Sequence, residues 1–186
     1  MSRFELRPTS IDGLQVIERQ PIGDTRGYLE RMFCIHELRM LILNRSIMQI
    51  NHTLTQKKGT VRGMHFQHQP NAEMKIVSCV RGEIFDVAVD IRRNSPTFLQ
   101  WHAEILSEKN HLSFFIPEGF AHGFQTLTSD CELLYFHTAN YRAEYEGALN
   151  VLDPRLAIFW PEPIAACSER DMHHPMLMPD FMGIDL

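Results

Sequence analysis

The sequence predicts an all-β fold, and two observations lead to this prediction. Short runs of alternating apolar and polar residues recur along the chain, with glycines and prolines scattered between them. Helix-forming patterns are few, and residues 35–42 carry the one short amphipathic stretch. Many short strands separated by turn residues are typical of a β-sandwich or a β-barrel.

Two segments in the first half of the chain are expected to be strands. Residues 49–55 alternate, and their polar side chains share one face, which predicts a polar cavity or contact with solvent. Residues 60–67 form an apparent strand that carries Arg62 and His65. Arg62 would point away from His65 on a regular strand, whereas a bulge at Gly63 would bring both into one cavity.

The clearest strand pattern covers residues 80–91, with Arg81 and Gly82 as the turn before it. Its apolar side chains share one face, while Asp86 and Asp90 share the other. We therefore expect these two carboxylates to face solvent or cations on neighbouring strands. Residues 112–116 and 131–136 alternate in the same manner and are the last predicted strands.

The chain is expected to form a single domain over residues 1–186. An N-terminal arm covers about residues 1–30, and a wrapping C-terminal tail covers about residues 161–186. The tail carries four prolines between positions 161 and 179 and little periodicity, apart from one helical turn near residues 168–172.

Composition narrows the functional classes. The 186 residues are 44% hydrophobic and 22% charged, with a formal net charge of −5, so a nucleic-acid partner is not expected. The four cysteines are far apart and form no CxxC pair, which favours small buried residues over a zinc cluster. Without a leader or an apolar run of roughly 18 residues, we expect a cytoplasmic protein with no membrane partner.

Several side chains near these strands could carry chemistry, and each has an ordinary structural alternative. His65 is either a core histidine or a base for proton transfer. Lys75 follows Glu73, so a surface ion pair competes with a functional cation. His122 is expected in a turn at a cavity mouth, and Tyr135 is either a core tyrosine or a proton donor.

The order and spacing of several motifs resemble one family over about residues 13–175, namely the dTDP-4-dehydrorhamnose 3,5-epimerases of the cupin superfamily. The motifs are Gly23-Asp-Thr-Arg-Gly27, Gly59-Thr-Val-Arg-Gly-Met-His-Phe-Gln67, Pro117-Glu-Gly-Phe-Ala-His-Gly-Phe124 and Ser168-Glu-Arg-Asp171. The resemblance implies a cupin-type jelly-roll β-barrel with a few short helices. It also implies a homodimer in which the arm of one subunit completes the partner's site, and a reaction without a cofactor.

The implied reaction inverts C3, C5 or both in a nucleotide-linked 4-keto-6-deoxyhexose through an enolate. By matching motif, His65 resembles the base and Asp171 its orienting carboxylate. Lys75 resembles the group that stabilises the enolate oxygen, and Tyr135 the acid on the opposite face. The implied substrate-binding residues are Arg26, Leu29, Arg31, Gln49, Asn51, Arg62, His122 and Tyr141.

One segment departs from the family pattern. The dTDP-specific members carry Arg-Gly-x-Phe-x-Glu, whereas residues 26–31 here place Leu29 and Arg31 at the aromatic and acidic positions. This departure leaves dTDP, CDP and GDP open as the nucleotide.

Two other functions remain as alternatives. His65 and His122 could be two ligands of a metal-dependent cupin, such as a dioxygenase or an isomerase. Gln67 stands where many metal cupins have another histidine, and glutamine is a poor ligand for such metals, so no metal is expected. The chain could also be a non-catalytic sugar-nucleotide-binding paralogue, but binding alone does not need a base and an acid on opposite faces.

Overall fold

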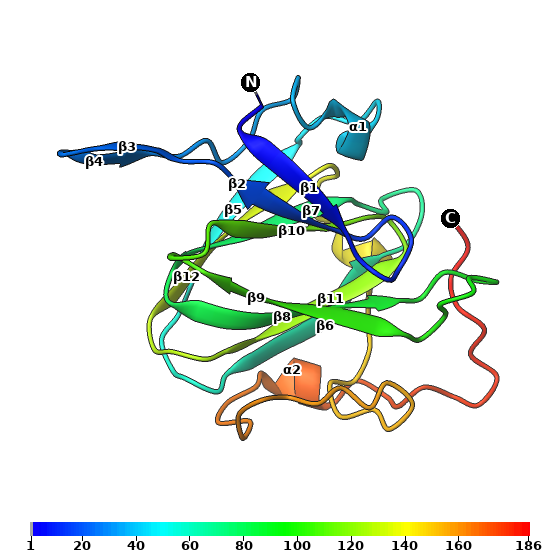
Figure 1. Ribbon diagram of the computed structural model, residues 1–186. Helices are drawn as coiled ribbons and strands as arrows, with labels where there is room; N and C mark the ends of the chain where they lie inside the picture. Colours follow the sequence, from blue (N-terminus) through cyan, green and yellow to red (C-terminus); the bar gives the residue numbers. More distant parts are fainter. Residues whose placement is uncertain (1) are drawn as a thin grey trace.

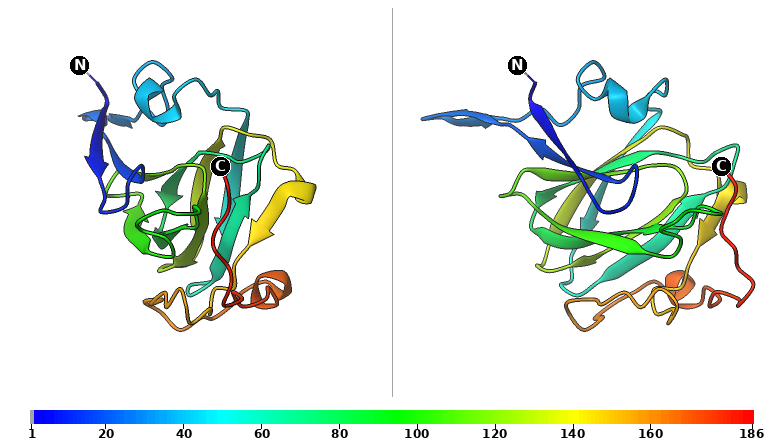
Figure 2. Two further views of the ribbon diagram at one scale, coloured as in Figure 1. Left: turned by 90° about the vertical axis from the view of Figure 1, so that its right-hand side faces the viewer. Right: turned by 45° about the vertical axis from the view of Figure 1, so that its right-hand side comes forward.

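The computed structural model describes residues 2–186 and shows two antiparallel β-sheets packed face to face (Figures 1 and 2). The first sheet contains β1 (Phe4–Pro8), β2 (Gln15–Arg19), β10 (Leu112–Ile116), β7 (Lys75–Arg81), β12 (Cys131–His137) and β5 (Gln49–Thr55), in that order. The second contains β13 (Glu146–Ala148), β6 (Val61–Gln67), β11 (Phe120–Thr126), β8 (Glu83–Asp90) and β9 (Trp101–Ser107). The predicted all-β class is confirmed.

The strand predictions agree closely with these bounds. Residues 49–55 and 112–116 coincide with β5 and β10, and residues 131–136 lie within β12. The segment 80–91 divides at Gly82, whose φ of +79° suits glycine, so the end of β7 turns there into β8.

An apolar core fills part of the space between the sheets. Val77, Phe114 and Leu133 from the first sheet meet Ile84 and Phe124 from the second, and all five are buried. Each such side chain contributes about 1.5–3 kcal/mol when it leaves water. Beside this core, the inward face of β5 is polar, as its alternation predicted.

The two carboxylates of β8 are buried, which corrects the expectation that they face solvent. Asp86 and Asp90 are both fully buried, and Asp90 accepts hydrogen bonds from Arg92. The apolar face of β8 packs outside the barrel, where residues such as Val87 join a cluster with Trp160 of the tail. Because the tail covers that outer face, the acidic face is directed between the sheets.

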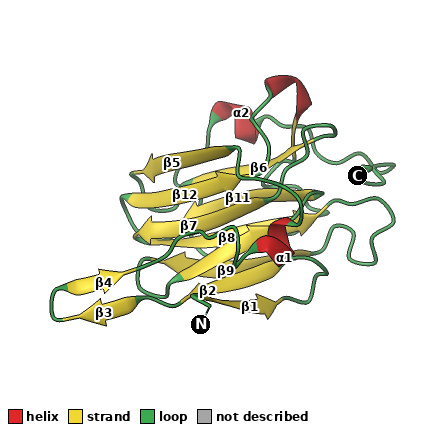
Figure 3. Cartoon of the chain, turned by 90° about the horizontal axis from the view of Figure 1, so that it is seen from above, coloured by secondary structure: helices red, strands yellow, loops and turns green. Residues whose placement is uncertain are grey.

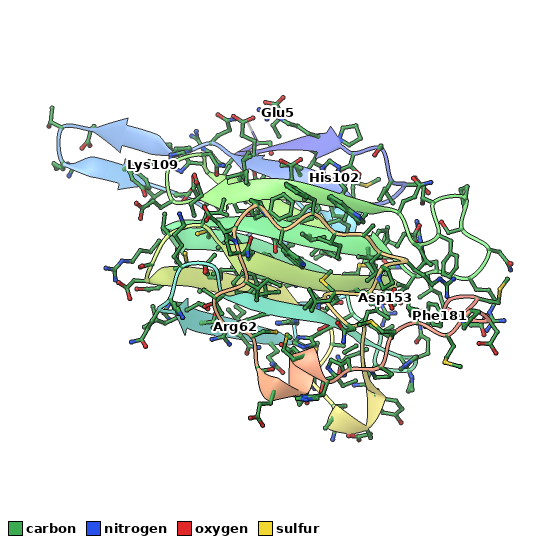
Figure 4. The ribbon with its side chains drawn as sticks, turned by 90° about the horizontal axis from the view of Figure 1, so that it is seen from below. Glu5, Arg62, His102, Lys109, Asp153 and Phe181 are labelled. Atoms are coloured by element: carbon green, nitrogen blue, oxygen red, sulfur yellow. The ribbon has the colours of Figure 1, made fainter. Side chains whose placement is uncertain are left out.

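Within the predicted N-terminal arm, β1 and β2 belong to the first sheet, and only the hairpin of β3 (Ile22–Asp24) and β4 (Gly27–Leu29) projects from it, at one end of the molecule in Figures 1 and 3. At the other end, the C-terminal segment runs past Asp153 and Phe181 (Figure 4).

The tail contacts the second sheet. It contains α2 (Glu169–Met172), and the Ser168 hydroxyl caps this turn by accepting a hydrogen bond from the Asp171 amide at 3.0 Å. The helical turn predicted near residues 168–172 is thus confirmed. Thr60 forms a β-bridge to Ala166 farther up the tail, which holds this part against the entry of β6.

The remaining helical elements are short. Of the amphipathic stretch at residues 35–42, only α1 (Arg39–Ile42) is helical, and it ends at Leu43, whose φ is +52°. A 3-10 turn, η1 (Ala143–Tyr145), precedes β13.

All four cysteines, which lie within the described residues, are free. Cys79 and Cys131 are buried as expected, whereas Cys34 and Cys167 are half-buried. Across residues 2–186, none of the helices is both long and apolar enough to cross a membrane.

Candidate active site

A cavity of about 230 Å³ opens between the two sheets. Strands of both sheets contribute to its walls. The residues that line it are Asn51, Thr53, Arg62, His65, Phe66, Gln67, Glu73, Lys75, His122, Phe124, Tyr135, His137, Tyr141 and Glu146. Most of the candidate catalytic residues therefore meet in one place.

A bulge in β6 directs Arg62 and His65 into this cavity. His122 of β11 pairs with His65 and Phe124 pairs with Arg62, so two residues of β6 oppose one of β11. A Cβ on Gly63 would lie 2.5 Å from the Cα of Gly123, so the strands approach this closely only with glycine there. Of the two possibilities left open by the sequence, a regular strand or a bulge at Gly63, the structure has the bulge, and both side chains therefore reach the cavity.

His65 is hydrogen-bonded to Asp171, which comes from α2 in the tail. His65 Nε2 lies 2.9 Å from Asp171 Oδ1, and the Gly63 amide donates to Asp171 Oδ2 at 3.4 Å. Burial opposes ionisation of this carboxyl, but the hydrogen bond and charge of His65 outweigh it and lower the pKa of Asp171. A fixed carboxylate on one ring nitrogen leaves the other, Nδ1, for a substrate proton.

Lys75 and Tyr135 occupy the facing wall, on β7 and β12 of the first sheet. Burial raises the pKa of the Tyr135 hydroxyl above its usual value, and the charge of Asp86 adds to the effect. The phenol is therefore protonated at neutral pH and suited to donate rather than accept a proton.

The ion pair between Lys75 and Glu73 exists, but it is buried instead of lying on the surface. The Lys75 Nζ to Glu73 Oε1 distance is 3.0 Å, and the side chains are only 7% and 10% exposed. Lys75 therefore presents its charge from within the cavity wall, where water screens it little.

His122 lies inside β11, not in a turn at the cavity mouth as expected. Its Nε2 is 2.6 Å from Asp86 Oδ1, and both side chains are buried. Burial lowers the pKa of His122, although Asp86 opposes the shift, so the ring is neutral at physiological pH. A neutral ring that already bonds Asp86 is suited to position substrate atoms or Tyr135, whose ring centroid is 6.1 Å away.

Gln49, Asn51 and Tyr141 form one connected edge of the site. Asn51 and Tyr141 line the cavity, while Gln49 stands behind them. Gln49 donates to Asn51 Oδ1 at 3.1 Å and accepts from the Tyr141 amide at 3.1 Å. Gln49 thus orients two lining residues.

The three arm candidates lie apart from the cavity. Arg26 pairs with Asp24 on the hairpin, Leu29 is exposed, and Arg31 pairs with Glu37. A separate shallow groove runs along the hairpin itself and includes Arg26 and Leu29. Within one chain, the arm does not contribute to the site.

Three ionisable cavity residues were not predicted as site residues, namely Glu73, His137 and Glu146. A signal existed for His137, because it falls two residues after Tyr135 and period-two alternation places both side chains on the same face. Glu73 was expected only as the partner of Lys75 in a surface ion pair. Glu146, on β13, gave no comparable signal.

The donor atoms nearest to His65 differ from those of the metal alternative. Among residues 2–186, the group with three candidate ligand atoms within 4.8 Å of one another combines His65 with Asp171 and His174, and does not include His122. His122 instead directs its Nε2 to Asp86.

Comparison with known proteins supports the resemblance found in the sequence. The family model described as dTDP-4-dehydrorhamnose 3,5-epimerase matches residues 8–178. The dTDP-4-dehydrorhamnose 3,5-epimerase of Sinorhizobium fredii is 41% identical over 169 residues, which cover 90% of this chain and 87% of that protein.

Solved structures of epimerases have folds similar to that of this chain. The dTDP-6-deoxy-D-glucose-3,5-epimerase of Legionella pneumophila, in complex with dTDP-4-keto-L-rhamnose, is 42% identical with a TM-score of 0.86, covering 90% of this chain and 89% of that one. ChmJ, a 3'-monoepimerase of Streptomyces bikiniensis solved with dTDP-quinovose, is 32% identical with a TM-score of 0.82, covering 91% and 86%. The predicted cupin-type barrel is confirmed, and the chain belongs to the dTDP-4-dehydrorhamnose 3,5-epimerase family.

Proposed function

We propose that the protein is an isomerase that inverts C3 and C5 of a dTDP-linked 4-keto-6-deoxyhexose. One observation carries the proposal: the His65–Asp171 pair faces Tyr135 and Lys75 across a single cavity. A base on one wall and an acid on the other are what inversion at a carbon needs. Family membership and relatives bound to dTDP-sugars support the class of substrate.

The chemistry follows from the carbonyl at C4. This group makes the neighbouring C–H bonds acidic, so His65 removes a proton and an enolate forms. Lys75 stabilises the negative oxygen of the enolate from a buried position. Tyr135 then donates its proton to the carbon from the opposite wall, which inverts the centre.

The extent of inversion is part of the proposal. The matched family and the Sinorhizobium and Legionella relatives are 3,5-epimerases, whereas ChmJ inverts one centre. We assign both centres to this protein, because its higher identities are to the 3,5-epimerases.

The test uses a dTDP-linked 4-keto-6-deoxyhexose in deuterated water and follows two signals, deuterium exchange and net inversion at C3 and C5. His65→Asn should abolish exchange at both carbons, because no base remains. Tyr135→Phe should reduce inversion more than exchange, because the proton can still leave and return on the base side. His52→Gln, on the outer face of β5, is the control and should behave as wild type.

Equal loss of both signals in the two variants would contradict the assignment of base and acid to opposite faces. Exchange and inversion confined to C3 would reduce the proposal to a 3-epimerase.

The protein is also proposed to act as a homodimer that exchanges its arms. The hairpin projects away from the sheets (Figure 3). Its side chains Ile22, Tyr28 and Leu29 are 48%, 62% and 68% exposed. Exposed apolar side chains on a protruding hairpin are typical of a segment that packs on a partner. Arg26 would then bring its guanidinium to the diphosphate of a substrate held by the other subunit.

Subunit mixing tests the exchange. Arg26→Ala and His65→Asn chains are each expected to be inactive, but a mixed dimer contains one site in which both residues are intact. Mixing should therefore restore part of the activity. If subunits demonstrably exchange and no activity returns, each site is built from a single chain.

A further inference from the structure

The cavity contains a second carboxylate–histidine pair, formed by Glu73 and His137. His137 Nδ1 lies 2.7 Å from Glu73 Oε2, and both side chains are nearly buried, at 13% and 10% exposed. Glu73 uses its other oxygen to bind Lys75 at 3.0 Å. One carboxylate thus connects the proposed enolate-stabilising lysine to an imidazole that also lines the cavity.

His137 is a direct neighbour of the proposed acid. Tyr135 and His137 are two residues apart on β12, and their rings are stacked with centroids 5.9 Å apart and planes 13° apart. With Nδ1 bound to Glu73, the remaining Nε2 faces the cavity, where it can accept a hydrogen bond from Asn51 Nδ2 at 3.4 Å. The pair occupies the wall that faces His65–Asp171.

Glu73 holds both neighbours as a carboxylate. Burial opposes ionisation of Glu73, but the charges of Lys75 and His137 and their hydrogen bonds lower its pKa to about 2, so it stays negative. This charge fixes the His137 ring through Nδ1 and keeps Lys75 paired. The other titratable side chains around this cavity are Arg62, His65, His122, Tyr135, Tyr141 and Glu146.

The proposed reaction leaves a proton imbalance that this pair can correct. After Tyr135 protonates the carbon, it is a phenolate in a buried setting that disfavours its charge. His65 meanwhile carries the proton that it removed from the other face. Before the next turnover, Tyr135 must gain a proton and His65 must lose one.

We propose that His137, held by Glu73, returns the proton to Tyr135 after each inversion. In this step His137 accepts a proton at Nε2 from cavity water and passes it to the Tyr135 phenolate, directly or through a second water, which leaves neutral imidazole and neutral phenol. The His65 imidazolium releases one proton to solvent for each proton taken up here, so the balance over a turnover is zero. His137 acts through Tyr135, and the inference rests on the proposed epimerase function.

Burst kinetics test this role. Tyr135 is already protonated in the resting enzyme, so the first inversion in His137→Gln should proceed at the wild-type rate. Later inversions should slow by at least about tenfold, because general acid catalysis typically contributes 10²–10⁴-fold. Because each substrate is inverted at two carbons, rapid-quench measurement should show one inverted carbon per site followed by a slower phase, while deuterium exchange by His65 is retained. Imidazole added to His137→Ala should accelerate the slow phase.

Controls separate this role from a structural one. Glu73→Gln retains a hydrogen-bonding side chain but lacks the charge, so it should show a weaker burst of the same kind. His52→Gln removes a histidine that pairs with Glu132 on the outer face of the sheet, and it should show no burst. Titration with dTDP should give similar affinities for all variants, which shows that the cavity is intact.

A wild-type steady state in both His137→Gln and Glu73→Gln would overturn the inference, as would a first turnover slowed as much as later ones. If wild type neither exchanges nor inverts the substrate, the proposed function itself fails, and that outcome is distinct from these.

Discussion

Asp171→Asn isolates the contribution of the carboxylate behind the proposed base. The asparagine keeps the shape of the side chain but replaces an accepting oxygen with an amide that can donate. Asp171 Oδ1 lies 2.9 Å from His65 Nε2, and the carboxylate is only 4% exposed. An amide NH₂ facing His65 Nε2 favours the tautomer whose proton is on Nδ1, and that ring cannot accept a substrate proton.

The magnitude follows from the hydrogen bond that is lost. A hydrogen bond to a charged group contributes about 1.5–3 kcal/mol, and if it strengthens as His65 becomes charged, the rate falls about 10- to 150-fold. The wrong tautomer adds to this loss. Affinity for dTDP should stay within about threefold of wild type, because Asp171 does not line the cavity.

Solvent-deuterium exchange and dTDP titration on the same preparations give both quantities. Asp153→Asn is the matched control, since Asp153 is also buried and accepts hydrogen bonds from backbone amides, those of Arg155 and Leu177. That variant weakens the contact with Leu177 but keeps the Asp171 carboxylate, so it should lose stability with a smaller loss of exchange than Asp171→Asn. If Asp171→Asn exchanges within threefold of wild type, then Asp171 does not orient the base and the reasoning is refuted.

Three further predictions concern other parts of the molecule. Exhaustive chelation should leave epimerisation unchanged, and loss of activity that returns with added metal would favour a metal-dependent cupin. Leu29→Phe combined with Arg31→Glu should raise dTDP affinity by up to roughly tenfold in calorimetric titration, because an aromatic face against the base contributes about 0.5–1.5 kcal/mol. If the order of the dTDP, CDP and GDP affinities does not change, these two positions do not select the nucleotide. Burial opposes ionisation of Asp90, but hydrogen bonds from Arg92 and neighbouring hydroxyls outweigh burial and lower the pKa of Asp90 in the folded protein. The ionised carboxylate therefore stabilises the fold fully at pH values above the pKa of an unfolded Asp, near 3.9. This stabilisation is lost as the pH falls through the lower pKa of the folded state. Asp90→Asn should therefore destabilise the fold by about 2–4 kcal/mol at neutral pH and by less below pH 4, and an equal loss of unfolding free energy at pH 7 and pH 3 would refute this account.

Strand patterns predicted β5, β6, β8, β10 and β12, because each of these strands has one face that suits its environment, but they missed the other strands of the two sheets, among them β9 and β11. Residues 49–55 and 112–116 were located to the residue in this way. The same rule misassigned β8, since it assumes that apolar side chains face the interior and acidic ones face water. On β8 the tail covers the apolar face, and His122 satisfies Asp86 from within the barrel. A two-face pattern does not reveal what covers each face.

The candidate site was predicted partly by residue chemistry and mainly by resemblance. The bulge that unites Arg62 and His65 was deduced from their spacing around Gly63. By contrast, two hydrogen bonds of the site join residues that are far apart in the sequence. His65 and Asp171 are 106 positions apart, and His137 and Glu73 are 64 positions apart. Contacts of that separation depend on how the sheets stack, and local periodicity contains no information about stacking.

The position of Asp171 makes the irregular tail more than a cover for the second sheet. The aligning carboxylate belongs to a segment that is attached by a capped turn, a β-bridge at Ala166, apolar contacts with β8 and hydrogen bonds from Asn150 to the carbonyls of Met172 and His174. Local opening of that segment would withdraw the carboxylate while the barrel stayed folded. The free energy of tail attachment then sets the fraction of molecules in which Asp171 aligns His65. Substitutions at Trp160, which is distant in sequence from His65 and does not line the cavity, would therefore change the turnover rate in graded steps.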